Sequence, residues 1–429
     1  MPPQTLDVAV SGLNLKFQAV RSVTRSLAAR LSAEDQMIQS CPEASPVKWH
    51  QAHTTWFFET FVLRAFMTDY EPLCEDFRWL FNSYYNSLGE VIPEKKLRAS
   101  FSRPSLDEIV AFRAHVDQEM KKFLASPVDD EPTRRIVLGL NHEQQHQELA
   151  LTDIKNAFFT NPLHPSFSTG SLSEEGNLAI PKLHWHSFEG GLIEIGYPLD
   201  TENPRDFCFD NETPQHKVYL EPFQIANREV TCGEYLEFML DNAYTRPEFW
   251  LSAGWNTVKA LGWQGPLYWQ RDELDETGWH LFTLRGWHGL SVLRDTPVCH
   301  ISLFEADAYA RWRGCRLPTE AEWEHVATES PLSGNLLDSG RLHPAPARGG
   351  GIEQLFGDCW EWTASAYTGY PGYKPLPGAL GEYNGKFMSG QMVLRGGSCV
   401  TPADHIRATY RNFFQPETRW QFSGIRLAK

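Results

Sequence analysis

The character of the sequence changes near residue 165, and this change limits what the chain can fold into. Before it, apolar residues recur at helical spacing; after it, short β-forming runs alternate with many Gly, Pro, Asn and Asp residues. Residues 161–166 contain two prolines and end the last helical pattern, and 168–177 form a mostly polar Ser/Gly linker. Because 429 residues exceed one ordinary core, we expect two domains, at 1–168 and 180–429.

The first domain contains four stretches with the apolar periodicity of amphipathic helices, at 13–38, 49–66, 105–124 and 131–157. Ser105 predicts a helix start, because Glu108 follows three residues later as in a capping box. The apolar stripe after it includes Val110 and is interrupted only by Arg113, whose stem can cover apolar surface. Four helices are the number of a bundle whose core can hold a metal ion.

The second domain reads as α+β with long irregular loops. Short β-like runs lie at 192–195, 217–220 and 393–395, and amphipathic helices are expected near 231–240 and 303–313. Most of the fifteen tryptophans follow residue 180, and large rings suit the stabilisation of irregular backbone. The predicted fold class is therefore an α+β multidomain protein with an N-terminal four-helix bundle.

Composition excludes several classes of partner. A formal net charge of -15 and a pI near 5.5 argue against nucleic acid or an anionic membrane surface. No apolar run reaches membrane-spanning length, and the first residues lack the layout of a signal peptide. The eight cysteines form no C-x-x-C pair and read as reduced thiols. We therefore expect a cytoplasmic protein with small-molecule partners, no nucleic acid and no membrane.

Two histidine clusters carry the strongest chemical signal. His142 and His146 are four residues apart in a predicted helix, so both imidazoles lie on one helical face and can share a metal ion. The alternative is that both are surface histidines that form hydrogen bonds and bind no metal. His50 or His53 can supply a third nitrogen, and helical spacing permits either. Three histidines leave coordination positions open, which is typical of a catalytic metal.

Two neighbours of these histidines have predicted positions. Gln145 lies three residues after His142, hence on the same face and near the metal; the alternative is a solvated glutamine. Glu148 lies two residues after His146, which turns it away from that face. We expect a surface salt bridge for Glu148, with support of a metal ligand as the weaker alternative.

Six motifs together carry a family resemblance. The first domain, with WHQAHT at 49–54 and HEQQHQE at 142–148, resembles the DinB-like four-helix metal-binding domain. The second resembles the formylglycine-generating-enzyme or sulfatase-modifying-factor fold, a C-type-lectin-like scaffold. Its marks are RLPTEAEWE at 316–324, GDCWEWT at 357–363, LRGGS at 394–398 and GIRL at 424–427. In this order, the two domains resemble the ergothioneine-pathway sulfoxide synthases over essentially the whole chain.

The resemblance implies a non-haem iron enzyme. Such an enzyme uses O2 to join a thiol donor to C2 of the imidazole of hercynine (trimethylhistidine), and it forms a sulfoxide. The resemblance places Fe(II) on His53, His142 and His146, and leaves His50 to packing or to support of a ligand. Neutral imidazoles suit Fe(II).

The resemblance also implies substrate contacts. It gives Gln145 the imidazole side of hercynine, and Asn412 and Phe413 the end with the trimethylammonium and carboxylate groups. An aromatic face beside a quaternary ammonium is physically favourable. A pair of aromatic residues that only packs a core loop is the alternative. A lone Cys399 near the C-terminal region has no thiol partner there, so formylglycine-generating activity is not expected.

Four tyrosines are candidate proton donors. Tyr84 and Tyr85 occupy the place where one subgroup of the family has its active-site tyrosines, and we rank this pair first. Other members use a tyrosine of the C-terminal domain, for which Tyr373 and Tyr383 are the candidates. A phenol suits the role because its ordinary pKa of about 10 keeps it protonated at neutral pH.

The prediction of the sulfur donor rests on charged residues that some family members carry and this chain lacks. Members that take γ-glutamylcysteine carry arginines after the paired tyrosines, but 88–92 contains none and 88–102 retains only Arg98. Phe414 and Thr418 stand where those members carry an acid and an arginine, although Arg419 is adjacent. Unmet buried charges of a dipeptide would be costly, so a smaller donor such as cysteine is favoured. A selenosugar donor, as in the related selenoneine synthases, remains open. A separate, non-enzymatic alternative is that the lectin-like half is a binding module and the histidines are a vestigial metal site.

Overall fold

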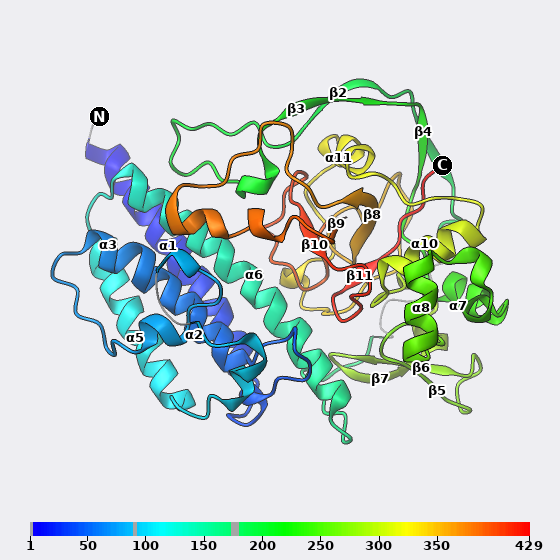
Figure 1. Ribbon diagram of the computed structural model, residues 1–429, viewed down its shortest axis with the longest axis horizontal. Helices are drawn as coiled ribbons and strands as arrows, with labels where there is room; N and C mark the ends of the chain where they lie inside the picture. The colour runs from blue at the N-terminus through cyan, green and yellow to red at the C-terminus, as the bar shows by residue number, and fades with distance from the viewer. Residues whose placement is uncertain (1–2, 89–91, 173–179) are drawn as a thin grey trace. The chain divides into compact units, whose positions relative to one another are not determined.

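The computed structural model describes residues 3–88, 92–172 and 180–429 (Figure 1). The chain forms two compact units. The first comprises Met1–Thr160, Leu199–Phe209 and Pro375–Tyr383; the second comprises Asn161–Pro198, Asp210–Lys374 and Asn384–Lys429. Residues 89–91 and part of the expected linker, 173–177, lie outside the described residues.

The first unit is helical, as the periodicity predicted. Its helices are α1 (Pro3–Ala28), α2 (Val47–Phe58), α3 (Arg64–Phe66), α4 (Phe77–Leu80), α5 (Leu106–Phe123) and α6 (Asp130–Thr160). A π-helical turn, η2 (Glu59–Leu63), continues α2 into α3. Helix α2 packs against both α5 and α6, and α1 packs against α6 (Figure 1). Gly139 of α6 permits this close approach, because a Cβ there would lie 2.8 Å from the Phe58 ring of α2.

Helix α5 confirms one detail of the sequence prediction and corrects another. Ser105 and Glu108 form the expected capping box, with the Ser105 side chain accepting from the Glu108 amide. Val110 is 53% exposed, so it does not belong to the buried stripe. Arg113 is fully buried and pairs with Glu143 instead of covering apolar surface. The prediction failed because α6 supplies a buried carboxylate at that point, which periodicity cannot reveal.

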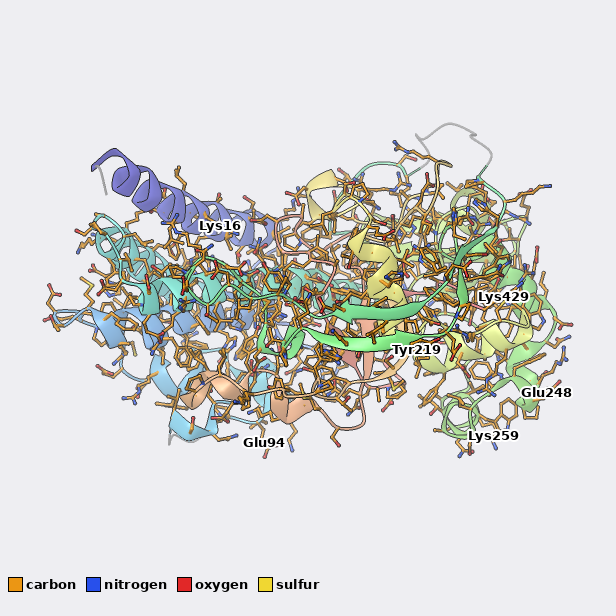
Figure 2. All side chains as sticks on the ribbon, turned by 90° about the horizontal axis from the view of Figure 1, so that it is seen from above. Lys16, Glu94, Tyr219, Glu248, Lys259 and Lys429 are labelled. Carbon is orange, nitrogen blue, oxygen red and sulfur yellow. The ribbon has the colours of Figure 1, made fainter. Side chains whose placement is uncertain are left out.

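The second unit is built from short strands. β1 (Trp185–Phe188) pairs with β4 (Phe223–Ala226), and β2 (Gly191–Ile195) with β3 (His216–Leu220), both antiparallel. A three-stranded sheet contains β5 (Trp269–Arg271), β6 (Trp279–Thr283) and β7 (Gly286–Gly289). A four-stranded sheet has the order β10 (Asn412–Phe414), β9 (Met392–Arg395), β8 (Trp360–Ala366), β11 (Ser423–Gly424). Leu192 and Tyr219 lie opposite each other on one face of the β2–β3 ribbon and are 67% and 63% exposed; Tyr219 is labelled in Figure 2.

The helices of this unit include two that the sequence analysis missed. Those expected are α7 (Cys232–Leu240) and α10 (Leu303–Trp312); those missed are α8 (Ser252–Leu261) and α11 (Glu320–Thr328), beside the single-turn α9 (Leu290–Leu293). A capping box of Thr319 and Glu322 starts α11, inside a motif that had been assigned only to the family resemblance. None of the helices in the described part of the chain is long and apolar enough to cross a membrane.

Candidate metal centre

The close contact of α2 with α6 brings three histidines together. His53 comes from α2, and His142 and His146 come from successive turns of α6. One ligand atom from each lies within 4.8 Å of the others. The ring centroids are 4.9 Å apart for His53 and His142, and 4.6 Å apart for His142 and His146. Such a cluster has the size and donor set of a three-histidine metal site.

The hydrogen bonds of these rings leave nitrogens available for a metal. The backbone oxygen of Phe81 lies 2.7 Å from His53 Nδ1, which therefore donates to it and leaves Nε2 as the free lone pair. His53 Nε2 is buried and has no hydrogen-bond partner among the described residues, and the same holds for both nitrogens of His142. Buried polar atoms rarely stay without partners. A metal ion is the partner that fits these atoms.

Burial also sets the protonation of the cluster. It lowers the pKa of His142 to about 3, and it holds the pKa of His53 and His146 well below the usual range. The neighbouring histidines add to the effect at His53 and His146, because like charges oppose each other. The imidazoles are therefore neutral at pH 7, the form that binds a metal.

His50 lies behind the cluster in a hydrogen-bonded chain. Its Nδ1 lies 2.7 Å from Nδ1 of His146, and its Nε2 lies 3.1 Å from Oδ2 of Asp153. The Ser45 amide donates to the same carboxylate oxygen at 2.8 Å. With Asp153 accepting from Nε2, His50 Nδ1 accepts the proton of His146 Nδ1, and His146 Nε2 remains for a metal.

Asp153 is a site residue that the sequence analysis missed. It follows His146 by seven residues, two helical turns on the same face, and this spacing was the available signal. Glu148 corrects a second expectation, because it is buried, with 4% exposure, and cannot form a surface salt bridge. Helix α6 is covered on more than one side, so a residue turned away from the histidine face is still inside the unit.

Of the candidate tyrosines, Tyr383 contacts the histidine cluster. Its hydroxyl donates to Oε1 of Gln145, and its ring centroid lies 5.5 Å from that of His142. Tyr84 lies one ring further out, 6.4 Å from Tyr383 and 4.7 Å from Tyr85. Tyr373, which belongs to the second unit, donates to Asp210 at 3.0 Å. Tyr383 and Gln145 therefore lie side by side at the cluster.

Tyr85 is held in an aromatic core. It is fully buried, and its ring centroid lies 5.5 Å from that of Trp56 and 5.2 Å from that of Phe61. Burial raises the pKa of Tyr85 well above its ordinary value, so this phenol stays protonated. The ranking of Tyr84 and Tyr85 above Tyr383 rests on the resemblance and stays a prediction, while in the structure Tyr383 contacts both His142 and Gln145.

The predicted hercynine contacts near the end of the chain lie in the second unit. Asn412, Phe413 and Phe414 form the edge strand β10, and the Phe413 ring stacks on Tyr367 at 3.9 Å. The Asn412 side-chain oxygen accepts from the Phe413 amide at 2.9 Å. Phe413 and Phe414 are half-buried, whereas Thr418 is buried.

Arg419 is already engaged within the second unit. Its Nε lies 3.2 Å from a carboxylate oxygen of Glu305, and it donates to the Gly265 carbonyl. Its guanidinium carbon lies 4.1 Å from the Trp263 ring centroid. These contacts occupy the arginine that stands next to the expected donor position.

Arg98 is a buried cation that forms no ion pair among the described residues, and the Asp153 carboxylate is the negative charge that acts on it most. It donates to the hydroxyls of Ser45 and Ser83 at 2.7 and 2.8 Å. Its guanidinium carbon lies 3.4 Å from the ring centroid of Trp49, which in turn stacks on His53 at 4.5 Å. No carboxylate of the described chain lies within ion-pair distance of it. Burial lowers the pKa of Arg98 to about 9, so it remains charged at neutral pH.

Comparison with known proteins agrees with both halves of the fold. A family model of the DinB superfamily matches residues 16–150, and one of the sulfatase-modifying factor enzyme 1-like domain matches 184–345 and 342–429. Hercynine oxygenase of Mycolicibacterium smegmatis is 30% identical over 416 residues, covering 90% of this chain and 91% of that protein.

Two further relatives match smaller shares. Ergothioneine biosynthesis protein 1 of Schizosaccharomyces pombe is 28% identical over 69% of this chain and 40% of its own length. The formylglycine-generating enzyme of Streptomyces coelicolor is 29% identical over 56% of this chain and 85% of its own length. The likeness of this chain to hercynine oxygenases over most of its length shows that the protein is an oxidoreductase. The chain belongs to the hercynine oxygenase family.

Proposed function

We propose that this chain is an Fe(II)- and O2-dependent sulfoxide synthase of ergothioneine synthesis. It joins a thiol to the C2 carbon of the hercynine imidazole. The imidazole C–H, the thiol S–H and O2 give the sulfoxide and one water, so O2 accepts four electrons. The observation that carries the proposal is the cluster of His53, His142 and His146, with buried unpartnered nitrogens, in a chain of this family.

The proposed roles of the residues are supported by their contacts and by the chemistry of their side chains. The three histidines hold Fe(II), which supplies the reduction of O2 when bound. Gln145 orients the imidazole of hercynine, and its oxygen already accepts the Tyr383 proton. Tyr383 keeps a proton at Oη beside His142, ready for transfer to a reacting oxygen. Phe413, stacked on Tyr367 in the second unit, offers an aromatic face of the kind that suits a trimethylammonium group.

Arg98 favours cysteine as the donor over a selenosugar. The buried Arg98 guanidinium feels the Asp153 charge but has no carboxylate in direct contact among the described residues, so a substrate carboxylate could pair with it directly. Cysteine brings one carboxylate, and a neutral sugar brings none. Arg419 is engaged by Glu305, so the second carboxylate of γ-glutamylcysteine has no comparable arginine at that position.

A donor competition tests the proposal. Fe(II)-loaded protein is incubated with hercynine, O2 and equimolar cysteine, γ-glutamylcysteine and a selenosugar, and the products are identified by mass. We expect the cysteine-derived sulfoxide to dominate. Exclusive formation of the selenium–carbon product would replace this function by selenoneine synthesis. Hercynine binding without iron retention or any coupled product would leave only a binding module.

A further inference from the structure

A short segment from late in the chain belongs to the helical unit. Pro375–Tyr383 packs with Met1–Thr160 in the first unit, although the sequence on both sides of it belongs to the second unit. It ends in Glu382 and Tyr383, the latter beside His142. The placement of Tyr383 therefore depends on what fastens this segment to the helical unit.

Glu382 makes two hydrogen bonds that can do this. Its Oε2 accepts from the Asn86 amide at 3.0 Å, and its Oε1 accepts from the Ser87 amide at 2.8 Å. One carboxylate thus holds two consecutive backbone N–H groups, and charge-assisted bonds of this kind are stronger than neutral ones. The two amides directly follow Tyr84 and Tyr85, so one contact fixes the loop with the tyrosine pair to the residue before Tyr383.

Other contacts of Tyr383 act on its side chain, and one of them joins its ring to that of Tyr84 at 6.4 Å between centroids. The Tyr383 ring also stacks on Phe209 at 5.5 Å with an interplanar angle of 8°, and its hydroxyl donates to Gln145. These contacts restrict the ring once the segment is in place. Gln145 is also the residue proposed to turn to the substrate imidazole, so its bond to Tyr383 can be exchanged during turnover.

We infer that Glu382 is a positioning residue, which holds Tyr383 Oη beside His142 through the Asn86 and Ser87 amides. The inference deepens the proposed function and rests on it. Without this contact, Tyr383 spends less time at the cluster, and turnover shifts from coupling to thiol dioxygenation. In that side reaction both atoms of O2 go to the sulfur, giving a sulfinate, and hercynine is not consumed.

The test uses Glu382→Gln, which has nearly the same volume but one carbonyl acceptor and an NH2 group that faces an amide donor. Glu382→Ala removes both acceptors. The matched control is Glu108→Gln, which alters a carboxylate that accepts from the Ser105 amide at 2.7 Å at the start of α5 in the same unit. All variants are made in the full chain.

Two readouts are measured. In metal-free protein, hydrogen exchange of a peptide that covers residues 84–88 should accelerate roughly threefold or more in Glu382→Gln, because both amides lose a charged acceptor. In Fe(II)-loaded protein with hercynine and cysteine, the sulfoxide-to-sulfinate ratio should fall roughly three- to tenfold, with O2 consumption and the hercynine KM nearly unchanged. Glu382→Ala should be at least as affected, and Glu108→Gln should match wild type in both.

Failure of this inference is distinguishable from failure of the proposed function. Faster exchange at 84–88 with an unchanged product ratio would show that Glu382 only anchors the segment, and it would overturn the positioning role. Unchanged exchange in Glu382→Ala would overturn the contact itself. If wild-type protein forms no coupled product with any donor, the proposed function fails, while the exchange result still decides whether Glu382 holds the 84–88 loop.

Discussion

At the scale of single residues, Tyr383 and Tyr85 show how surroundings decide the role of a phenol. Tyr383 meets His142 and Gln145, whereas Tyr85 is enclosed by Trp56 and Phe61. A phenol next to a proposed metal ligand and a proposed substrate contact can pass on its proton, whereas a phenol enclosed by aromatic rings mainly fills space. We therefore propose Tyr383 as the residue that delivers the proton.

Tyr383→Phe should lower the sulfoxide-to-sulfinate ratio by at least roughly tenfold, because general-acid groups commonly contribute more than that. O2 consumption should continue, since the histidines are untouched. Product ratios are measured by mass after a fixed uptake of O2, with Tyr373→Phe as the control. A wild-type ratio in Tyr383→Phe, together with a reduced ratio in Tyr84→Phe or Tyr85→Phe, would return the role to the tyrosine pair.

The sequence alone indicated the clustered histidines, but it did not reveal the residues that hold the side chains of the site in place. The spacing of His142 and His146 needs only the geometry of one helix. The choice of His53 over His50 needed the family resemblance, and the structure places His50 between His146 and Asp153. Glu382 is about three hundred residues away from the amides it binds, and no local pattern marks such a contact.

At the scale of secondary-structure elements, prediction succeeded where one face of one element decides the outcome. Helices α5 and α6 follow from periodicity and a capping box. The π-helical turn after α2 and the ion pair of Arg113 with Glu143 depend on packing between helices, so they were not foreseen. The strands β2, β3 and β9 were predicted correctly. Helix α11 was missed because its motif at 316–324 was used only as a mark of the family resemblance.

The turn before β8 offers a test of stability against pH. Asp358 accepts from the Asn335 side chain at 2.8 Å and the Ala345 amide at 2.7 Å, both at Oδ1. Burial raises the pKa of Asp358 to about 7. Because the folded pKa lies above the unfolded one, this group's contribution to stability is complete at acid pH and is lost as the pH rises through about 7.

Asp358→Asn keeps an oxygen acceptor for both bonds and removes the charge, and Asn tolerates the positive φ of 54° at this position. We expect its melting temperature at pH 8 to rise by roughly 3 °C, with a smaller gain toward pH 4. Tryptophan fluorescence follows this unit, because most tryptophans lie in it. The exposed Asp338→Asn serves as control, and a gain independent of pH would contradict the assigned cause.

At the scale of the whole molecule, the sequence predicted a helical domain followed by an α+β domain. It did not predict that two short segments from the second half of the chain belong to the helical unit. The helical and sheet-rich halves follow from periodicity, composition and motif, and family models match each. Leu199–Phe209 and Pro375–Tyr383 are grouped with the helical unit despite their place in the chain. Each is held by contacts that are distant in sequence, which composition does not encode.

Iron binding by His53, His142 and His146 is the claim on which the proposed function depends. The direct measurement is iron content and Fe(II) affinity of wild type, His146→Ala and His115→Ala after anaerobic loading and desalting. His115 is the control, a histidine of the same unit whose Nε2 lies 2.9 Å from the Glu71 carbonyl. We predict a single retained iron in wild type and His115→Ala, and binding at least roughly 100-fold weaker in a folded His146→Ala. Stoichiometric iron of unchanged affinity in His146→Ala would contradict the three-histidine site.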